Sequence, residues 1–296
     1  MTRDASPDRN VRTFTSRLAG RVQQIDSLVC VGLDPARGQM PEGIRASAAG
    51  AVEFCTAIIK ATAPFALAYK PNLAFFLAYG RDGIAALYDV RAAIPASIPV
   101  ILDCKVGDIS STDAAYATAW FDELNVDAIT VHPYLGEDSL EPFLKYPDKG
   151  VIVLAKTSNA GSGDLQDRTL GGTGQPLYEY VATRAAQWEQ DYPASVGLVV
   201  GATWPVQLAR IRKVAPTLPI LLPGVGTQGG NVAESIDAGL LPDGSGLLCS
   251  SSRGVTYASS GPDFAEAAGN ATRDLRDLIN AHRTGDSLSK AEHGCA

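Results

Sequence analysis

An α/β barrel of eight parallel strands is the fold that this sequence predicts, and three observations support the prediction. Eight short, uniformly apolar runs recur along the chain. Stretches with helical character separate these runs, and such alternation is typical of a parallel sheet covered on both faces. The chain has 296 residues, of which 46% are hydrophobic, so it is long enough for a barrel of roughly 250 residues. We therefore predict a single (β/α)8 TIM barrel.

The predicted strands are the apolar runs themselves, at 28–33, 66–69, 98–102, 127–131, 150–155, 196–200, 219–222 and 246–249. Helices are predicted between them, among others at 49–61, 112–124, 176–190 and 205–214. The barrel then spans about residues 28–258. No linker divides the chain, so residues 1–296 are predicted to form one domain.

The segments on either side of the barrel predict helices. Residues 12–25 have an apolar helical face, and we expect this helix to cover the floor of the barrel. That face consists of Phe14, Leu18, Val22 and Ile25. A C-terminal helix and tail are predicted over about 262–296. The final stretch, TGDSLSKAEHGCA, has the composition of a disordered tail.

Charge and composition exclude several classes of partner. The formal net charge is −7, so the basic footprint of a nucleic-acid-binding protein is missing. The polar first residues and the lack of a long apolar run predict no membrane association. The five cysteines are odd in number and show no C-x-x-C spacing, which is typical of reduced thiols in the cytoplasm. Only three histidines are present, which argues against a histidine metal site.

Polar residues follow several of the predicted strands. The first strand is followed by Asp34, the second by Lys70, the third by Asp103 and Lys105, and the fourth by His132. In a TIM barrel the carboxyl ends of the strands form one rim, where the chemistry takes place. Alternation along the third strand places Asp103 and Lys105 on the same side. Any one of these charges alone is as readily a structural ion pair, but their convergence on one rim favours a reaction centre.

The loops after the seventh and eighth strands predict a phosphate site. Residues 223–228 read P-G-V-G-T-Q, and Arg253 follows the eighth strand. Barrels commonly bind phosphate at these two loops. Gly224 and Gly226 would let the backbone approach an anion closely, and Gln228 adds a polar side chain. Glycine turns are common in loops, so the motif alone is weak; its pairing with Arg253 favours the phosphate site.

A long glycine-rich loop, residues 157–175, follows the fifth strand. Loops of this length are usually functional or disordered. Ser158 and Asn159 at its base offer a hydroxyl and an amide suited to the polar edge of a heterocycle. The glycines beyond them could hinge a lid; the alternative is a flexible insertion with a polar start.

Taken together, these segments resemble the orotidine 5'-phosphate decarboxylase family, which completes de novo UMP synthesis. The central motif D-x-K-x-x-D-I-x-x-T is formed here by Asp103, Lys105, Asp108, Ile109 and Thr112. Further matching segments are VGLDP at 31–35, YKPN at 69–72, TSN at 157–159, VGAT at 200–203, PGVGTQGG at 223–230 and SSR at 251–253. The resemblance covers about residues 28–258 and is greatest to the longer bacterial branch of the family.

The resemblance implies a role for each matching residue. Asp34 and Lys70 would hold the ribose hydroxyls, Ser158 would contact the pyrimidine, and Gln228 and Arg253 would bind the phosphate. Further substrate-binding candidates are Ile109, Thr112, Asn159, Gly224 and Gly226.

The resemblance also implies a homodimer with shared active sites. Lys70, Asp103 and Lys105 would form a charged array, which Asp108 and Thr112 of the partner subunit would complete. Lys70, Asp103, Lys105 and Asp108 are therefore the predicted catalytic residues. One departure is His132, which stands where asparagine is common in this branch, so the contribution of the fourth strand stays open.

The predicted reaction converts orotidine 5'-monophosphate to UMP and CO2. Loss of CO2 from C6 of the base leaves a carbanion with no adjacent carbonyl sink, so positive charge must be supplied there. Lys105, flanked by Asp103 and Asp108, would remain an ammonium group and donate its proton to C6. We expect no metal or organic cofactor.

Two alternatives remain at this point. The first is a Mg-dependent sugar-phosphate decarboxylase or aldolase of the same barrel superfamily, which shares D-x-K-x-x-D. That enzyme would have an acidic metal ligand after the second strand, where this chain has Lys70, whose charge repels Mg²⁺. The second is a catalytically silent barrel that binds a phosphate ligand. Such a protein would be expected to lose part of the charged array, and this chain retains all of it.

Overall fold

The structure is a computed structural model that describes residues 12–172, 174–225 and 232–283. Within these residues, eight parallel strands form one sheet in the order β2-β1-β8-β7-β6-β5-β4-β3. The strands are β1 (Val29–Leu33), β2 (Ala68–Pro71), β3 (Ile101–Val106), β4 (Ala128–Val131), β5 (Gly150–Lys156), β6 (Ser195–Val200), β7 (Ile220–Pro223) and β8 (Leu247–Ser251). Isolated parallel bridges, Tyr69 to Val100 and Asn72 to Asp103, join β2 to β3 and close the sheet. The predicted (β/α)8 barrel is thus confirmed.

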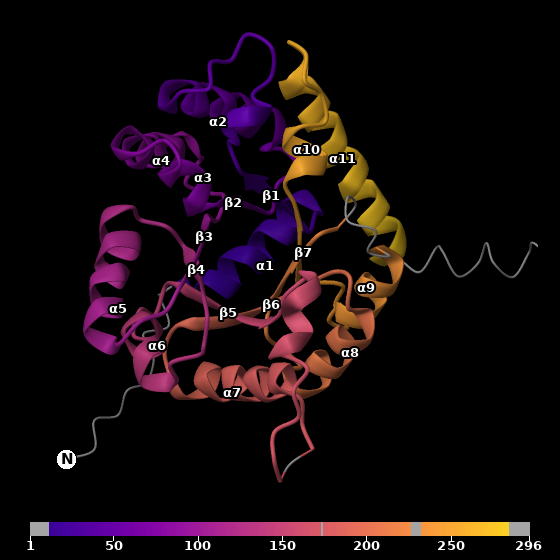
Figure 1. Cartoon of the computed structure of the whole chain (residues 1–296). Coiled ribbons are helices and arrows are strands. Elements are labelled where there is room, and N and C mark those ends of the chain that lie inside the picture. The colour runs from indigo at the N-terminus through magenta and orange to yellow at the C-terminus, as the bar shows by residue number, and fades with distance from the viewer. Residues whose placement is uncertain (1–11, 173, 226–231, 284–296) are drawn as a thin grey trace, which may run out of the picture.

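Helices surround the strands as an outer ring (Figure 1). The helices of the described residues, of which α1 lies inside this ring, are α1 (Phe14–Ile25), α2 (Ala48–Thr62), α3 (Leu73–Leu77), α4 (Arg81–Ala93), α5 (Ser110–Ala117), α6 (Glu137–Leu144), α7 (Leu177–Asp191), α8 (Pro205–Val214), α9 (Val232–Gly239), α10 (Arg253–Thr256) and α11 (Phe264–Arg283). Three short turns of other helix types lie at η1 (Arg37–Gln39), η2 (Thr118–Glu123) and η3 (Ala160–Asp164). The helix predicted at 112–124 is therefore two elements, α5 and the π-helical η2.

Helix α1 covers the floor of the barrel, as the sequence predicts, and it crosses the middle of the ring in Figure 1. Phe14 lies directly over Gly150, the first residue of β5, where a Cβ would come within 2.5 Å of its ring. Thr15 N donates to the hydroxyl of Ser195, the first residue of β6, at 3.2 Å. Because α1 covers the amino ends of the strands, the mouth of the barrel is at their carboxyl ends.

The second and third strands extend further toward the mouth than their apolar runs. β2 includes Lys70, and β3 continues through Asp103 and Lys105 to Val106. The predicted strands end at residues 69 and 102, because charged residues rarely continue a buried strand. Here they do so because Lys70 and Asp103 form an ion pair, and pairing is what makes a buried charge tolerable.

The C-terminal helix α11 packs against α2 on the outside of the barrel. The predicted disordered tail, residues 284–296, lies outside the described residues. In the part of the chain that the structure describes, every helix is too short or too polar to cross a membrane.

Candidate active site

The mouth of the barrel holds two adjoining cavities of about 640 Å³ and about 730 Å³. Lys70, Ser158 and Pro223 line both of them, so the two cavities form one elongated site. Asp103 and Lys105 line the first cavity, and Arg253 lines the second. Ligand sites of roughly 300–1,000 Å³ accept small molecules. The site therefore has room for an elongated ligand. One end of the site holds a charged array, and the other end holds the Arg253 cation.

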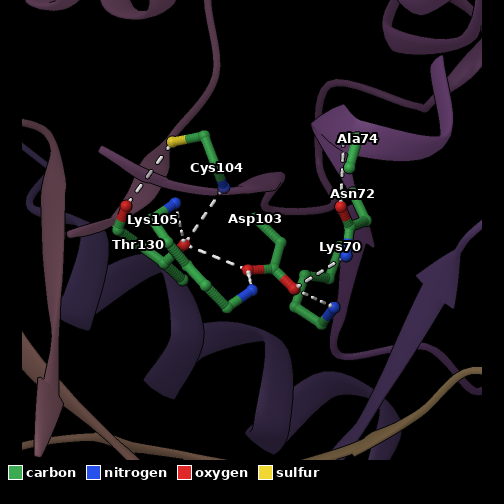
Figure 2. Close-up of polar contacts among 7 residues, drawn as sticks. All are labelled: Lys70, Asn72, Ala74, Asp103, Cys104, Lys105 and Thr130. Carbon is green, nitrogen blue, oxygen red and sulfur yellow. Dashed lines mark hydrogen bonds and ion pairs between the residues drawn. The ribbon is translucent and has the colours of Figure 1, made fainter. Parts of the chain in front are cut away.

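Asp103 is the centre of the charged array, with one lysine on each side (Figure 2). Its Oδ2 accepts a hydrogen bond from Lys70 Nζ at 2.8 Å, and its Oδ1 contacts Lys105 Nζ. The Lys70 side chain is 6% exposed, whereas that of Lys105 is 48% exposed. Lys70 is therefore held inside the wall of the barrel, and Lys105 is the lysine that is free to meet a ligand in the cavity.

The charges within the array hold one another in their ionised forms. Burial alone lowers the pKa of the Lys70 ammonium group, but the carboxylates of Asp103 and Asp34 outweigh burial and raise this pKa above its ordinary value. Burial raises the pKa of Asp103, but Lys70 and Lys105 together lower it well below its ordinary value. Asp103 is therefore a carboxylate, and Lys70 an ammonium group, at neutral pH.

The regular alternation predicted for the third strand is wrong in detail. The pairing of β3 with β4 shifts between Leu102 and Val106, and Lys105 has a φ of 48°. The strand therefore contains a bulge at its charged residues. Asp103 and Lys105 meet through this bulge, because it turns the Lys105 side chain back toward the Asp103 carboxylate.

Asp108 forms its hydrogen bonds within the turn that follows β3. Its backbone N–H donates to Asp113 Oδ2 at 3.0 Å, and its own Oδ1 accepts from Ile109 N at 2.7 Å. Among the described residues that line the two mouth cavities, Asp108, Ile109 and Thr112 are all missing. The reason is that the chain turns away from the mouth after β3 to begin α5. Ile109 is 62% exposed at this turn.

Asp34 and Gly224 lie with Arg253 around the second cavity, at the ends of β1, β7 and β8. Asp34 Oδ1 is buried and has no hydrogen-bond partner among the described residues, so it is available to a ligand hydroxyl. The Tyr257 hydroxyl donates to Asp34 O at 2.7 Å and thereby fixes the backbone of Asp34. Gly224 has a φ of 94°, which favours glycine at this turn. The predicted ligands Gly226 and Gln228 lie outside the described residues.

Ser158 and Asn159, at the start of the glycine-rich loop, both line the first cavity, and Ser158 also lines the second. Gly201, from the V-G-A-T segment after β6, makes this position possible. A Cβ on Gly201 would lie 2.8 Å from the Cα and Cβ of Ser158. The glycine therefore lets the loop pack closely enough for Ser158 to reach the cavity.

Lys156 is a residue that the sequence analysis missed. It ends β5, is fully buried, and its Nζ lies 2.7 Å from Asp167 Oδ1 and 4.6 Å from the centre of the Trp204 ring. Gln166 also bonds back to the loop, donating to Thr157 Oγ1 at 2.8 Å. Residues 166 and 167 thus tie the loop to its own base. The sequence did contain a signal for Lys156, because this lysine directly follows an apolar run, just as Lys70 does.

His132 does not line either mouth cavity, although it follows β4 as predicted. Its ring lies against Gly107, where a Cβ would come within 2.6 Å of His132 Cε1. It lines a third cavity together with Tyr134 and Trp188, and this cavity adjoins the first mouth cavity at Leu154, Leu165 and Gln166. His132 therefore contacts the segment between Lys105 and Asp108 and lines a cavity next to the first mouth cavity.

The described residues contain no group of three or more His, Cys, Asp or Glu side chains placed to hold a metal ion. At the end of β2, where the metal-dependent alternative requires a carboxylate, stands Lys70, bonded to Asp103. The expectation that no cofactor is needed stays a prediction.

Comparison with known proteins identifies the family. The model of the orotidine 5'-phosphate decarboxylase / HUMPS family matches residues 27–266. The chain is 51% identical over 271 residues to the orotidine 5'-phosphate decarboxylase of Thermomicrobium roseum, covering 92% of this chain and 96% of that one. The structure of Leishmania donovani OMP decarboxylase matches with a TM-score of 0.80 and 48% identity, over 92% of this chain and 99% of that one. Leishmania donovani UMP synthase matches with a TM-score of 0.82 and 49% identity over 92% of this chain, which spans 57% of its length. The chain therefore belongs to the orotidine 5'-phosphate decarboxylase / HUMPS family.

Proposed function

We propose that this protein decarboxylates orotidine 5'-monophosphate to UMP and CO2. The observation that carries the proposal is the array of Lys70, Asp103 and Lys105, which lines one end of a site whose other end is lined by Arg253. Two of the named relatives are decarboxylases of orotidine 5'-phosphate, and this chain matches them over nearly their whole length. Their names support the same substrate for this protein. The base would occupy the cavity of the array, and the phosphate the cavity of Arg253.

Lys105 is the group to which we assign the chemistry. As the C6–CO2 bond breaks, its electron pair stays on C6 and CO2 leaves. The half-exposed Lys105 ammonium group opposes this charge and then transfers a proton to C6, which yields UMP. Water returns the proton to Lys105. No electron acceptor or metal enters this balance.

The remaining site residues bind the substrate in this proposal. Asp34, with its unpartnered buried oxygen, and Lys70 would hold the ribose hydroxyls, and Ser158 would contact the pyrimidine. Arg253, which is exposed within its cavity, would bind the phosphate, together with Gln228. Binding energy from the distant phosphate can be used to close the site around the base.

A homodimer with shared sites is part of the proposal. Asp108 and Thr112 lie outside the mouth cavities of their own chain, and the neighbouring Ile109 and Tyr134 are 62% and 81% exposed. Large apolar side chains with such exposure are typical of a contact surface. A second copy placed here would cover these side chains, and Asp108 and Thr112 would then reach the active site of that second copy.

We place the protein in the cytoplasm, since the four cysteines that the structure describes are free thiols.

The activity is tested by following the loss of orotidylate absorbance with and without exhaustive chelation by EDTA. Turnover that is unchanged in EDTA supports the metal-free decarboxylase. Activity that is lost in EDTA and restored by Mg²⁺ would instead support the metal-dependent alternative, and absence of turnover in both conditions would leave only a ligand-binding barrel.

The shared site is tested by mixing two inactive variants, Lys105→Ala and Asp108→Ala, through co-refolding. In a mixed dimer one site has lost both groups and the other has kept both. Random pairing of equal amounts makes about half of the dimers mixed, so about a quarter of wild-type activity should return. If Asp108 served its own chain, every site would lack one group and no activity would return from a mixture that dimerises normally.

A further inference from the structure

The hydroxyl of Thr130, on β4, forms every hydrogen bond that a hydroxyl can form, and all of them go to residues 103–105. Its Oγ1 accepts from Cys104 N at 3.1 Å and from Lys105 N at 3.0 Å. It donates its proton to Asp103 Oδ1 at 3.1 Å (Figure 2). One donor and two acceptor positions are the full capacity of a hydroxyl. Thr130 is 1% exposed, so no bond to bulk water competes with these three.

These bonds are needed because the backbone of Lys105 is in an unfavourable conformation. Its φ of 48° lies in the left-handed region, which residues with a side chain rarely adopt. The shift in pairing between Leu102 and Val106 also removes the regular strand partners of the intervening N–H groups. The N–H groups of Cys104 and Lys105 are partly buried, and an N–H group shielded from water needs an acceptor. The Thr130 hydroxyl supplies it for two successive residues, where a regular strand would use carbonyl groups.

We propose that Thr130 is a positioning residue for the reaction: its hydroxyl holds the bulge that directs Lys105 into the cavity, and it fixes the Asp103 oxygen that Lys105 contacts. The role rests on the proposed decarboxylase activity. Thr130 acts through Lys105 and Asp103 and transfers no proton to the substrate. The same oxygen atom thus sets both the backbone of the proton donor and the orientation of its counter-charge.

Replacing Thr130 with valine tests this role, because valine keeps the branched shape and removes the hydroxyl. The partly buried N–H groups of Cys104 and Lys105 then lose their acceptor, and we expect the bulge to relax toward a conformation that needs no such acceptor. A shift of about 1 Å in a reacting group lowers the rate by about 10²-fold, so we expect kcat to fall by about that factor. KM for orotidine 5'-monophosphate and the affinity for UMP should stay within about threefold, since Arg253 and Asp34 line the other cavity.

Two further variants complete the experiment. Thr130→Ser restores a hydroxyl and should return kcat to within about threefold of wild type. Thr272→Val is the matched control, because Thr272 is also fully buried, and among the described residues its hydroxyl donates to Ala268 O, 2.7 Å away within α11. Its kcat should equal that of wild type. Thermal unfolding of all three variants tests whether each is folded.

The outcomes separate the role of Thr130 from the proposed function. If wild type and Thr272→Val do not decarboxylate orotidine 5'-monophosphate, the proposed function is refuted. If they do, wild-type kcat in Thr130→Val overturns the positioning role, and so does a loss of UMP affinity as large as the loss in kcat. Should Thr130→Val fail to fold, Thr130→Ser decides: kcat near wild type supports the role, and a 10²-fold loss despite the retained hydroxyl overturns it.

Discussion

Substituting Asp103 should destabilise the protein far more than substituting Lys105, although both changes should abolish turnover. Asp103→Asn removes the counter-charge of Lys70, whose side chain is 6% exposed. Leaving one member of a buried pair without its partner costs about 3–5 kcal/mol. Asp34 still favours the charge on Lys70, so we expect the lower end of this range. The Lys105 side chain is 48% exposed, and an ion pair of this kind contributes about 0–1 kcal/mol.

The assay is urea unfolding at pH 7 and at one fixed protein concentration, followed by tryptophan fluorescence and circular dichroism. The free energy of unfolding of Asp103→Asn should lie at least about 2 kcal/mol below that of Lys105→Ala. Adding Lys70→Met to Asp103→Asn should recover part of the loss, because the buried charge is then removed. If Asp103→Asn were as stable as Lys105→Ala, Lys70 would not depend on Asp103, and the reasoning would be refuted.

The effect of Asp103→Asn should also depend on pH in a defined way. The pKa of Asp103 is lowered in the folded protein, so its contribution to stability is complete above the ordinary aspartate pKa of about 3.9 and is lost as the pH falls through the folded value. The pKa of Lys70 is raised, so its contribution is complete below the ordinary lysine pKa of about 10.4 and is lost as the pH rises through the folded value. The stability difference between wild type and Asp103→Asn should therefore be constant between about pH 5 and pH 9.

Three further predictions concern other parts of the site. Arg253→Ala should lower kcat/KM for orotidine 5'-monophosphate by about 30-fold, the equivalent of about 2 kcal/mol for a hydrogen bond to a charged group. Steady-state kinetics should show little change for the nucleoside orotidine, and an equal loss for both substrates would show that Arg253 is not the phosphate ligand. Asp167→Asn should destabilise the protein more than Lys156→Met in urea unfolding, because it leaves the fully buried Lys156 charge without its carboxylate; the reverse order would contradict the anchoring role of Lys156. Both variants should speed proteolytic cleavage within residues 157–175, since each releases the contact that ties this loop to β5; unchanged cleavage would mean that the contact does not restrain the loop.

Local pattern in the sequence is enough to determine the barrel and the composition of its rim. Each strand is buried by helices on its outer face and by the packed barrel interior on its inner face, so it is apolar along most of its length, and this burial leaves a pattern that is visible without coordinates. Because all strands are parallel, residues that follow different apolar runs, such as Asp34, Lys70 and Lys105, meet at one end. The motifs at these positions also indicate the family, since they include the groups that carry the chemistry.

Tertiary structure alone decided how those residues are arranged. Lys105 has a left-handed backbone, and the acceptor of its N–H is the Thr130 hydroxyl, 25 positions further along the chain. Asp108 and His132 follow β3 and β4 but line neither mouth cavity, and the Asp108 N–H is bonded to Asp113. These outcomes depend on hydrogen bonds and packing between segments that are distant in sequence, where one bond can outweigh a local preference of about 1–2 kcal/mol. Periodicity reports which side of an element is buried, and it carries no information about such individual bonds.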